Sequence, residues 1–309
     1  MELIRGLHNL RPRHRGCVAT IGAFDGVHLG HQSVIAALLD KAAELKLPSV
    51  VIVFEPLPRE YFSPHKAPAR LMSFREKFKA LETLGVDRIL RIRFTERLQT
   101  MSAQEFIEDI FVTGLGSKYV VLGDDFRFGN DREGDLELMQ EQGQRFGFEA
   151  VPTKTYTFSD ERVSSTRIRK ALEEAKFSEA EKLLGRPYTI SGKVVYGRQL
   201  GRTLGSPTAN LELHRLRAPL AGVYAVTVTG AGLEDAPGVA NIGVRPTVND
   251  SIKANLEVHL LDFAGNLYGR TIEVTFCTKL RDEMKFASVD ELQKHIQKDI
   301  EQARAWFGL

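Results

Sequence analysis

The sequence predicts a doubly wound α/β domain with a parallel sheet, followed by a small antiparallel β-barrel and a C-terminal helix. In the first part, short apolar runs alternate with amphipathic helical patterns, which is typical of a parallel sheet covered by helices. From about residue 186, short β-rich runs are separated by Gly, Pro, Asn and Asp, which is typical of antiparallel strands. We therefore expect two domains, residues 1–185 and 186–309.

Length and composition agree with two globular domains. The chain has 309 residues, two cysteines and a net charge of +2, which favours a reducing compartment and argues against a nucleic-acid partner. No apolar run approaches the roughly 18 residues that cross a bilayer, and the N-terminus lacks the apolar core of a signal peptide. We expect a cytoplasmic protein without membrane association. The sequence leaves the oligomeric state open, with a monomer expected.

The stretch GAFDGVHLGH, residues 22–31, organises the first domain. It follows a strand predicted over 17–21 and opens a helix that begins near Gly30 or His31. The turn therefore lies at the carboxyl end of a parallel strand, where open α/β sheets bind ligands and a helix N-terminus attracts anions.

Two histidines mark this helix start. His28 and His31 fall on one side of the helix and could both donate to one phosphate, with Gly30 allowing close approach of the backbone. The alternative is that both histidines only cap and pack the helix. Zinc is disfavoured because no further His or Cys lies nearby at ligand spacing.

The rest of the first domain continues the alternation. Two prolines, Pro56 and Pro58, indicate a loop through about Ala69. Capping boxes open two helices. These boxes are Ser73/Glu76, before a helix with Phe74, Phe78, Leu81 and Leu84 inward and Gly85 at its end, and Ser102/Glu105. Further strands are predicted over 50–54, 88–94 and 119–122.

Two more polar loops accompany GAFDGVHLGH. GDDFRFG, residues 123–129, follows its strand as the first loop does, so the two loops could face one another; Asp124 and Asp125 are either ligands for magnesium or a ribose, or turn residues. VSSTRIR, residues 163–169, places hydroxyls at a helix N-terminus with Arg169 one turn inside. That arrangement suits a phosphate, although capping alone explains the serines.

The second domain has a polar loop of its own. GRQLGRTLGSPTAN contains Gly197, Gly201 and Gly205, which allow backbone to approach a phosphate chain or simply form turns. Thr208 and Asn210 alternate with Ala209, so both point to one side of an extended segment. Their oxygens suit magnesium and phosphate. Strands are predicted over 188–196, 222–228, 239–242, 256–261 and 271–276, with a capped helix from 288 to 307 packing on the barrel.

The string GAFDGVHLGH resembles the adenylyltransferase signature of bacterial bifunctional riboflavin kinase/FAD synthetases, which belong to the HIGH-type nucleotidyltransferases with a Rossmann-like sheet. VSSTRIR is similar to the SSTxIR motif of that family, which handles the ATP triphosphate. The resemblance implies that His28, His31 and Arg169 are catalytic. It implies nucleotide- or flavin-binding roles for Gly22, Phe24, Asp25, Gly30, Asp125, Ser164, Ser165 and Thr166.

PTAN, residues 207–210, resembles the riboflavin kinase half of the same family, as do GVYAV, GVANIGVRPT and LRDEMKF. The resemblance implies that Thr208 and Asn210 contact Mg²⁺ and ATP, and that Glu257 is the general base. Ser206 departs from the Phe that is usual before PTAN. The implied nucleotide-binding residues also include Gly197, Gly201, Arg202 and Arg281.

The resemblance implies two ATP-dependent reactions with small-molecule substrates. Riboflavin is phosphorylated to FMN in the barrel, and FMN is adenylylated to FAD in the α/β domain with release of pyrophosphate. One alternative is an adenylyltransferase whose barrel is an accessory module. A second is an RNA-binding protein on a synthetase-like domain, which the near-neutral charge disfavours.

Overall fold

The computed structural model describes residues 1–197, 206–246 and 252–309. The chain divides into two compact units: residues 1–68 and 74–164 form the first, and residues 69–73 and 165–309 form the second. The predicted domain boundary near residue 186 therefore differs from this division, which groups 165–185 with the second unit. Every helix in the described ranges is too short or too polar to cross a lipid bilayer.

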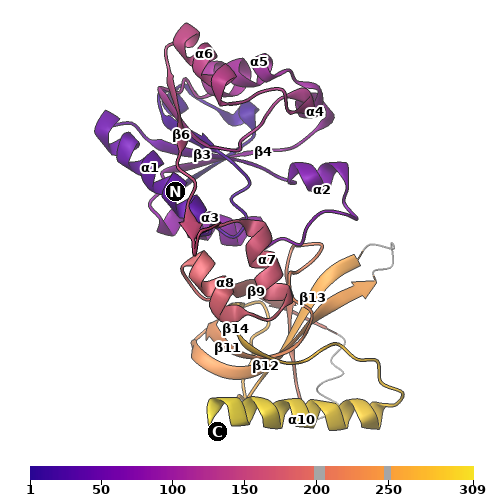
Figure 1. Ribbon diagram of the computed structural model, residues 1–309. Helices are drawn as coiled ribbons and strands as arrows, with labels where there is room; N and C mark the ends of the chain where they lie inside the picture. Colours follow the sequence, from indigo (N-terminus) through magenta and orange to yellow (C-terminus); the bar gives the residue numbers. More distant parts are fainter. Residues whose placement is uncertain (198–205, 247–251) are drawn as a thin grey trace. The chain divides into compact units, whose positions relative to one another are not determined.

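A six-stranded parallel sheet forms the centre of the first unit (Figure 1). Its strand order is β1-β4-β3-β2-β5-β6, and every neighbouring pair is parallel. The strands are β1 (Glu2–Arg5), β2 (Val18–Ile21), β3 (Ser49–Phe54), β4 (Arg88–Ile92), β5 (Tyr119–Gly123) and β6 (Glu149–Thr153). The predicted doubly wound sheet is confirmed, with β1 and β6 as additional edge strands.

The helices of the first unit are α1 (Leu29–Leu45), α2 (Pro58–Phe62), α3 (Phe74–Thr83), α4 (Glu96–Thr100), α5 (Ala103–Phe106) and α6 (Leu136–Phe146). Helices α1, α3 and α5 begin where the sequence predicts, whereas α2, α4 and α6 are additional. Short 3₁₀ turns lie at η1 (Leu7–Asn9), η2 (Pro12–His14) and η4 (Asn130–Arg132), and a two-stranded hairpin is formed by β7 (Thr157–Phe158) and β8 (Glu161–Arg162). The Ser102 capping box is confirmed, since the Ser102 hydroxyl accepts from the Glu105 N–H at 3.2 Å.

Three helical details differ from expectation. Residues predicted as loop contain α2, because Pro58 occupies the first helical turn, where its missing N–H is not needed. Helix α5 continues as a π-helix, η3 (Ile107–Gly114), whose wider turns are rare in proteins. On α3, Leu81 is buried as predicted, but the neighbouring buried side chain is Lys77, whereas Phe74 and Phe78 stay partly exposed.

The order of the strands brings the two predicted loops together. β2 pairs directly with β5, with Val18 opposite Tyr119 and Thr20 opposite Val121. Because both strands are parallel, the loops after Ile21 and Gly123 leave from the same edge of the sheet. This is the point where strand order reverses in a doubly wound sheet, which is where such folds bind ligands.

The second unit is a closed antiparallel barrel with strand order β10-β13-β12-β11-β14-β9. β10 also pairs with β9, which closes the sheet. The strands are β9 (Thr189–Val195), β10 (Ala209–Glu212), β11 (Gly222–Gly230), β12 (Leu233–Pro246), β13 (Ile252–Leu260) and β14 (Thr271–Arg281). Two helices precede the barrel, α7 (Ser165–Glu173) and α8 (Phe177–Leu184). The predicted barrel is confirmed.

The C-terminal helix α10 (Val289–Phe307) packs on β11, β12 and β14, as predicted (Figure 1). Its Ala303 lies in an apolar cluster with Val223 and Val239. An ion pair fixes the same helix, because the Arg281 guanidinium donates to the nearly buried Asp299 carboxylate at 2.8 to 3.2 Å.

We expect Asp299→Ala to loosen α10 selectively, since the change leaves Arg281 without the carboxylate that accepts three of its hydrogen bonds. The free energy of unfolding of the barrel should fall by about 2 to 4 kcal/mol. Trp306, the one tryptophan of the chain, lies on α10 and reports the loss by its fluorescence during urea unfolding. Glu301→Ala, an exposed change on the same helix, is the matched control, and an equal loss in both variants would contradict the assignment.

Candidate active sites

The turn after β2 holds an unusual backbone conformation. Phe24 has φ 46°, Gly26 φ 90° and Val27 φ 40°. Positive φ costs energy in any residue with a side chain, most of all in a β-branched one such as Val27, and such strain persists where surrounding contacts enforce it. Here Lys77 Nζ donates to the Ala23 carbonyl at 2.6 Å, and Gln32 Nε2 donates to the Val27 carbonyl at 3.0 Å.

Sequence reasoning missed Lys77. This side chain is 1% exposed, and it reaches the turn from α3. A buried lysine costs energy unless it is paired, so its placement against the turn is a specific feature of the site. A lysine among apolar helix positions in the sequence was the only signal, and it did not reveal that the side chain points inward.

His28 and His31 lie together, as predicted. Their rings stack face to face, with centroids 3.6 Å apart and an interplanar angle of 16°. His28 is the N-cap of α1, with its Nδ1 accepting from the His31 N–H at 3.2 Å. That acceptor role leaves Nε2 to carry the proton of a neutral ring. His28 can therefore cap the helix through Nδ1 and offer a donor through Nε2 at the same time.

Burial holds the pKa of His31 well below its usual value, with the charges of His28, Lys77 and Arg162 acting in the same direction. Its buried Nδ1 has no hydrogen-bond partner among the described residues. His31 is therefore neutral at physiological pH. An unpartnered polar atom at this position is suited to a ligand that brings its own polar group.

The other predicted residues of this turn have packing roles. Phe24 is buried, and its ring lies 5.1 Å from that of His31. A side chain at Gly30 would meet the His28 ring at 3.2 Å and the Val163 carbonyl at 3.4 Å. Gly30 therefore lets the segment before Ser164 approach the start of α1. Asp25 is buried in the same turn, and Gly22 lies under the Phe24 ring.

The GDDFRFG loop is held by an arginine that sequence reasoning did not single out. Arg162 Nη2 lies 3.2 Å from Asp124 Oδ1 and 2.9 Å from Asp125 Oδ1. The Thr155 hydroxyl also donates to Asp124. The two carboxylates therefore face β8, the strand that leads into VSSTRIR, and the Arg162 guanidinium partly balances their negative charge. Only the adjacent position of Asp124 and Asp125 in the sequence pointed to a cation.

Aromatic side chains gather beside these loops. Phe106 stacks on Phe128 with centroids 5.2 Å apart, and Phe54 lies edge-on to Phe94 at 5.7 Å. Tyr61 and Phe62 from α2 extend the group, and Phe62 is 54% exposed. We call these residues the aromatic cluster; its members are Phe54, Tyr61, Phe62, Phe94, Phe106, Phe126 and Phe128.

VSSTRIR continues into α7 as predicted, with Ser164 preceding the helix and Ser165 and Thr166 in its first turn. Arg169 is partly engaged in the fold, since its Nε donates to the Ala69 carbonyl at 2.6 Å. That bond ties the 69–73 segment to the helix. The phosphate-binding roles of these four residues stay predictions.

The barrel brings Thr208, Asn210 and Glu257 together. Asn210 pairs directly with Glu257 across β10 and β13, so their side chains share one face. Thr208 Oγ1 donates to Glu257 Oε2 at 3.5 Å, and Asn255 Nδ2 donates to Oε1 at 3.0 Å. Cross-strand register, which a single sequence does not show, is what places Glu257 opposite PTAN.

The position of Gly197 requires a glycine for a structural reason. A side chain there would overlap the Asn210 amide at 2.4 to 2.6 Å, so only glycine leaves room for that buried group. Gly201 and Arg202 lie outside the described residues. Ser206, which precedes PTAN, is buried and accepts from Gln297 of α10 at 3.5 Å. Arg281 is bound to Asp299, and its predicted nucleotide contact stays a prediction.

A cavity of about 220 Å³ opens beside Thr208. Its walls include Pro207, Phe263 and Tyr268, and Tyr268 stacks on the exposed Tyr196 with centroids 4.0 Å apart. Among the described residues, no three His, Cys, Asp or Glu side chains gather to hold a metal ion. The Thr208 hydroxyl, Asn210 amide and Glu257 carboxylate are instead hard oxygen donors of the kind that Mg²⁺ prefers.

Two known families match this arrangement. Residues 10–167 match the FAD synthetase family, and residues 184–307 match the riboflavin kinase family. The two matches leave most of α7 and α8 between them. The fold and the sites thus define a transferase of two modules, one for nucleotidyl transfer and one for phosphoryl transfer.

Relatives with both modules extend over the whole chain. A bifunctional riboflavin kinase/FMN adenylyltransferase from Pseudomonas fluorescens is 54% identical over 99% of this chain and 97% of its own. The protein of the same description from Escherichia coli K12 is 50% identical over 100% of this chain and 99% of its own. The chain belongs to the family of bifunctional riboflavin kinase/FMN adenylyltransferases.

A solved structure supports the fold at full length. The crystal structure described as a macrolide-efflux protein from Streptococcus pneumoniae has a TM-score of 0.77 and 31% identity, and covers 99% of this chain and 100% of its own.

The low pKa of His31 predicts that stability falls in acid. The unfolded chain, with a histidine pKa near 6.5, binds more protons than the folded one, so the free energy of unfolding decreases as the pH drops below about 6.5. The loss due to His31 should approach ~1.4 kcal/mol per pH unit. Urea unfolding of the protein and of His31→Gln between pH 7.5 and 5.5 measures it. Equal losses in both proteins would show that His31 is not the group responsible.

Proposed function

We propose that the two activities of the family are divided between the two modules, with FMN made by residues 186–309 and converted to FAD by residues 1–185. The observation that carries the first assignment is the Glu257 carboxylate beside Thr208. The stacked His28–His31 pair at the switch point carries the second.

In the barrel, Glu257 is placed to accept the proton of the riboflavin 5′-hydroxyl as that oxygen attacks the γ-phosphorus of ATP and ADP leaves. Asn255 and Thr208 fix its two carboxylate oxygens. Thr208 and Asn210 would hold Mg²⁺, which neutralises charge on the phosphates when bound. Positioning of the two substrates then accounts for most of the rate enhancement, because the protein forms no covalent bond during phosphoryl transfer.

In the α/β module, a phosphate oxygen of FMN attacks the α-phosphorus of ATP and pyrophosphate leaves. The cap bond uses His28 Nδ1, and we assign His28 Nε2 as the donor to the triphosphate. Neutral His31 stacks on it and fixes its ring plane. Lys77 holds the Ala23 carbonyl, and so the turn, in place. We assign the leaving pyrophosphate to Ser165, Thr166 and Arg169.

The aromatic cluster is the feature of the first module that suits a flavin ring. Phe62 is exposed and meets Phe94 at 5.5 Å, so an apolar planar ring can stack beside them. Asp125 would face the polar edge of the ring. The monomeric state, the cytoplasmic location and the absence of a nucleic-acid partner stay predictions from the sequence.

Glu257→Gln should lower FMN formation from riboflavin by on the order of 10² to 10⁴-fold, the usual range for a general base. Gln keeps the shape: its oxygen can still accept from Asn255 Nδ2, and its amide nitrogen can donate to the Thr208 hydroxyl, so the barrel should stay folded. Conversion of supplied FMN to FAD should be unchanged. Chromatographic separation of the flavins during a time course with ATP and Mg²⁺ measures both steps, and a parallel loss of the two would contradict the division.

His28→Asn should impair the other step alone. Asn is a good N-cap, so α1 keeps its capping bond while the donating ring nitrogen, Nε2, is removed. We expect FAD formation to fall by on the order of 10²-fold or more, as for the loss of one charge-stabilising donor. FMN should then accumulate from riboflavin at the unaltered rate. Normal FAD output would remove His28 from the catalytic residues.

A further inference from the structure

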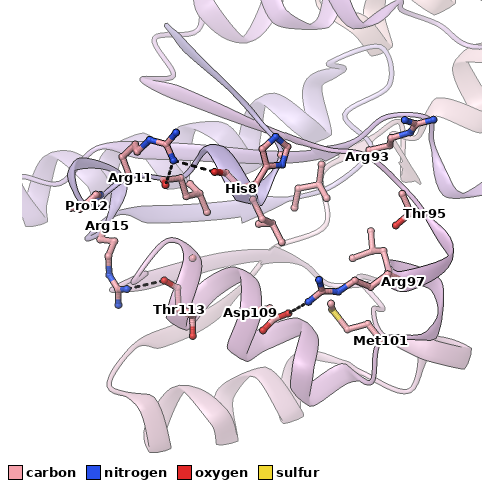
Figure 2. A pocket seen from close by; sticks show the side chains of 16 residues that line it. His8, Arg11, Pro12, Arg15, Arg93, Thr95, Arg97, Met101, Asp109 and Thr113 are labelled. Atoms are coloured by element: carbon pink, nitrogen blue, oxygen red, sulfur yellow. Dashed lines mark hydrogen bonds and ion pairs between the residues drawn. The ribbon is translucent and has the colours of Figure 1, made fainter.

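The first unit has a large pocket of its own, and no predicted site residue lines it. Its volume is about 710 Å³, within the range of small-molecule sites. It is bounded by the segment from Gly6 to Arg15, by the residues that follow β4, and by the π-helix η3 (Figure 2). None of the sixteen lining residues belongs to the aromatic cluster. A π-helix wall is a second unusual feature, because such turns recur at functional sites.

The pocket is strongly cationic. Its lining contains four arginines and one acidic residue, which leaves an excess of three positive charges, more than the net +2 of the entire chain. Arg11 and Arg15 stand on one side of the pocket, and Arg93 and Arg97 stand on the other (Figure 2). An anion of complementary charge is therefore the ligand that the pocket favours.

Two of these guanidinium groups are held in place without being neutralised. Arg11 Nη1 donates to the His8 and Leu10 carbonyls at 3.1 Å, and Arg15 Nη1 donates to the Thr113 carbonyl at 2.9 Å. Arg97 pairs with Asp109 at 3.3 Å, but its side chain is 83% exposed and such a pair is weak. Arg97 can therefore exchange this carboxylate for a phosphate at little cost.

The floor of the pocket is apolar. It is formed by the side chains of Leu7, Leu10, Ile92, Leu98 and Met101. The uncharged polar side chains of the lining are Thr95 and Thr113, beside His8. An adenine ring carries hydrogen-bonding atoms along most of its edge, and this floor leaves them unpaired. The dimethylbenzene edge of a flavin has no such atoms, so a flavin matches the floor better.

We propose that this pocket is a second FMN site, separate from the reaction centre, with the flavin edge on the apolar floor and the phosphate bound by Arg97 in the positive field of the other arginines. The assignment goes beyond the proposed function, because it gives FMN a binding place that takes part in neither transfer. FMN is the phosphorylated flavin that the activity of the family itself supplies.

Hydrogen–deuterium exchange of the full chain, with FMN and without ATP, tests the proposal. FMN should slow exchange in peptides covering residues 6–16 and 107–114. Riboflavin, inorganic phosphate and ADP at the same concentration separate the ring, the phosphate and the nucleotide as sources of protection. FMN alone should protect these peptides. No protection by FMN, or equal protection by riboflavin, phosphate or ADP, overturns the proposal.

The double variant Arg11→Gln/Arg97→Gln provides the matched test. Loss of the Arg97 bond to the phosphate and of the Arg11 charge should raise the FMN concentration for half-protection by on the order of 100-fold. Arg75→Gln, an exposed change on α3, should leave it unaltered. The KM for FMN in FAD synthesis should not move in the double variant, and a matching rise in that KM would show that the pocket is part of the reaction centre. Because exchange is read without turnover, failure of the proposed catalytic residues leaves this result unaffected.

Discussion

The pairing of β2 with β5 is the constraint on which the first module depends. The two strands are parallel, so the loops that follow them leave from the same edge of the sheet. Strand order reverses between them, so the connections that follow run to opposite sides of this point. Two polar loops that are far apart in the sequence thereby leave the same edge of the sheet. If the two strands were not neighbours, the histidine turn and the acidic loop would share no site.

Proximity alone does not form this turn. Its strained backbone conformation costs free energy, and buried side chains hold it in place. Positive φ at Phe24 and Val27 costs on the order of 1 to 3 kcal/mol per residue, which is a large share of the stability of an average domain. Lys77 and Gln32 bind the backbone carbonyls of this turn, and the His28 cap fixes the start of the helix that follows it. The barrel site needs less support, because Asn210 and Glu257 are placed by strand register.

Much of the fold and of the motifs is readable from the sequence, and the exceptions have physical reasons. Apolar periodicity is strong at β2, β3 and α1, and these elements lie where it predicts. Strand β1 is four residues with a charge at each end, which is too short and polar to show a pattern. Pro58 was interpreted as a helix breaker, although proline is favoured in a first turn.

The site residues divide in the same way. His28 and His31 are visible because they are three residues apart on one helix. Glu257 gained a role only from family resemblance, since contact with Thr208 arises across strands. Lys77 and Arg162 act through tertiary contacts with Ala23 and the two aspartates, which no local pattern encodes. Long-range partners of this kind are what single-sequence reasoning lacks.

The short segment 69–73 has a consequence for the modularity of the chain. It interrupts the first unit yet belongs to the second, where its carbonyls accept from Arg169, Tyr188 and the buried Arg215. No single cut in the chain therefore yields two fragments that each keep all their parts. A fragment that begins after residue 73 loses acceptors for a buried guanidinium, whatever its other boundary. The order of the chain therefore makes each unit depend on the intact polypeptide.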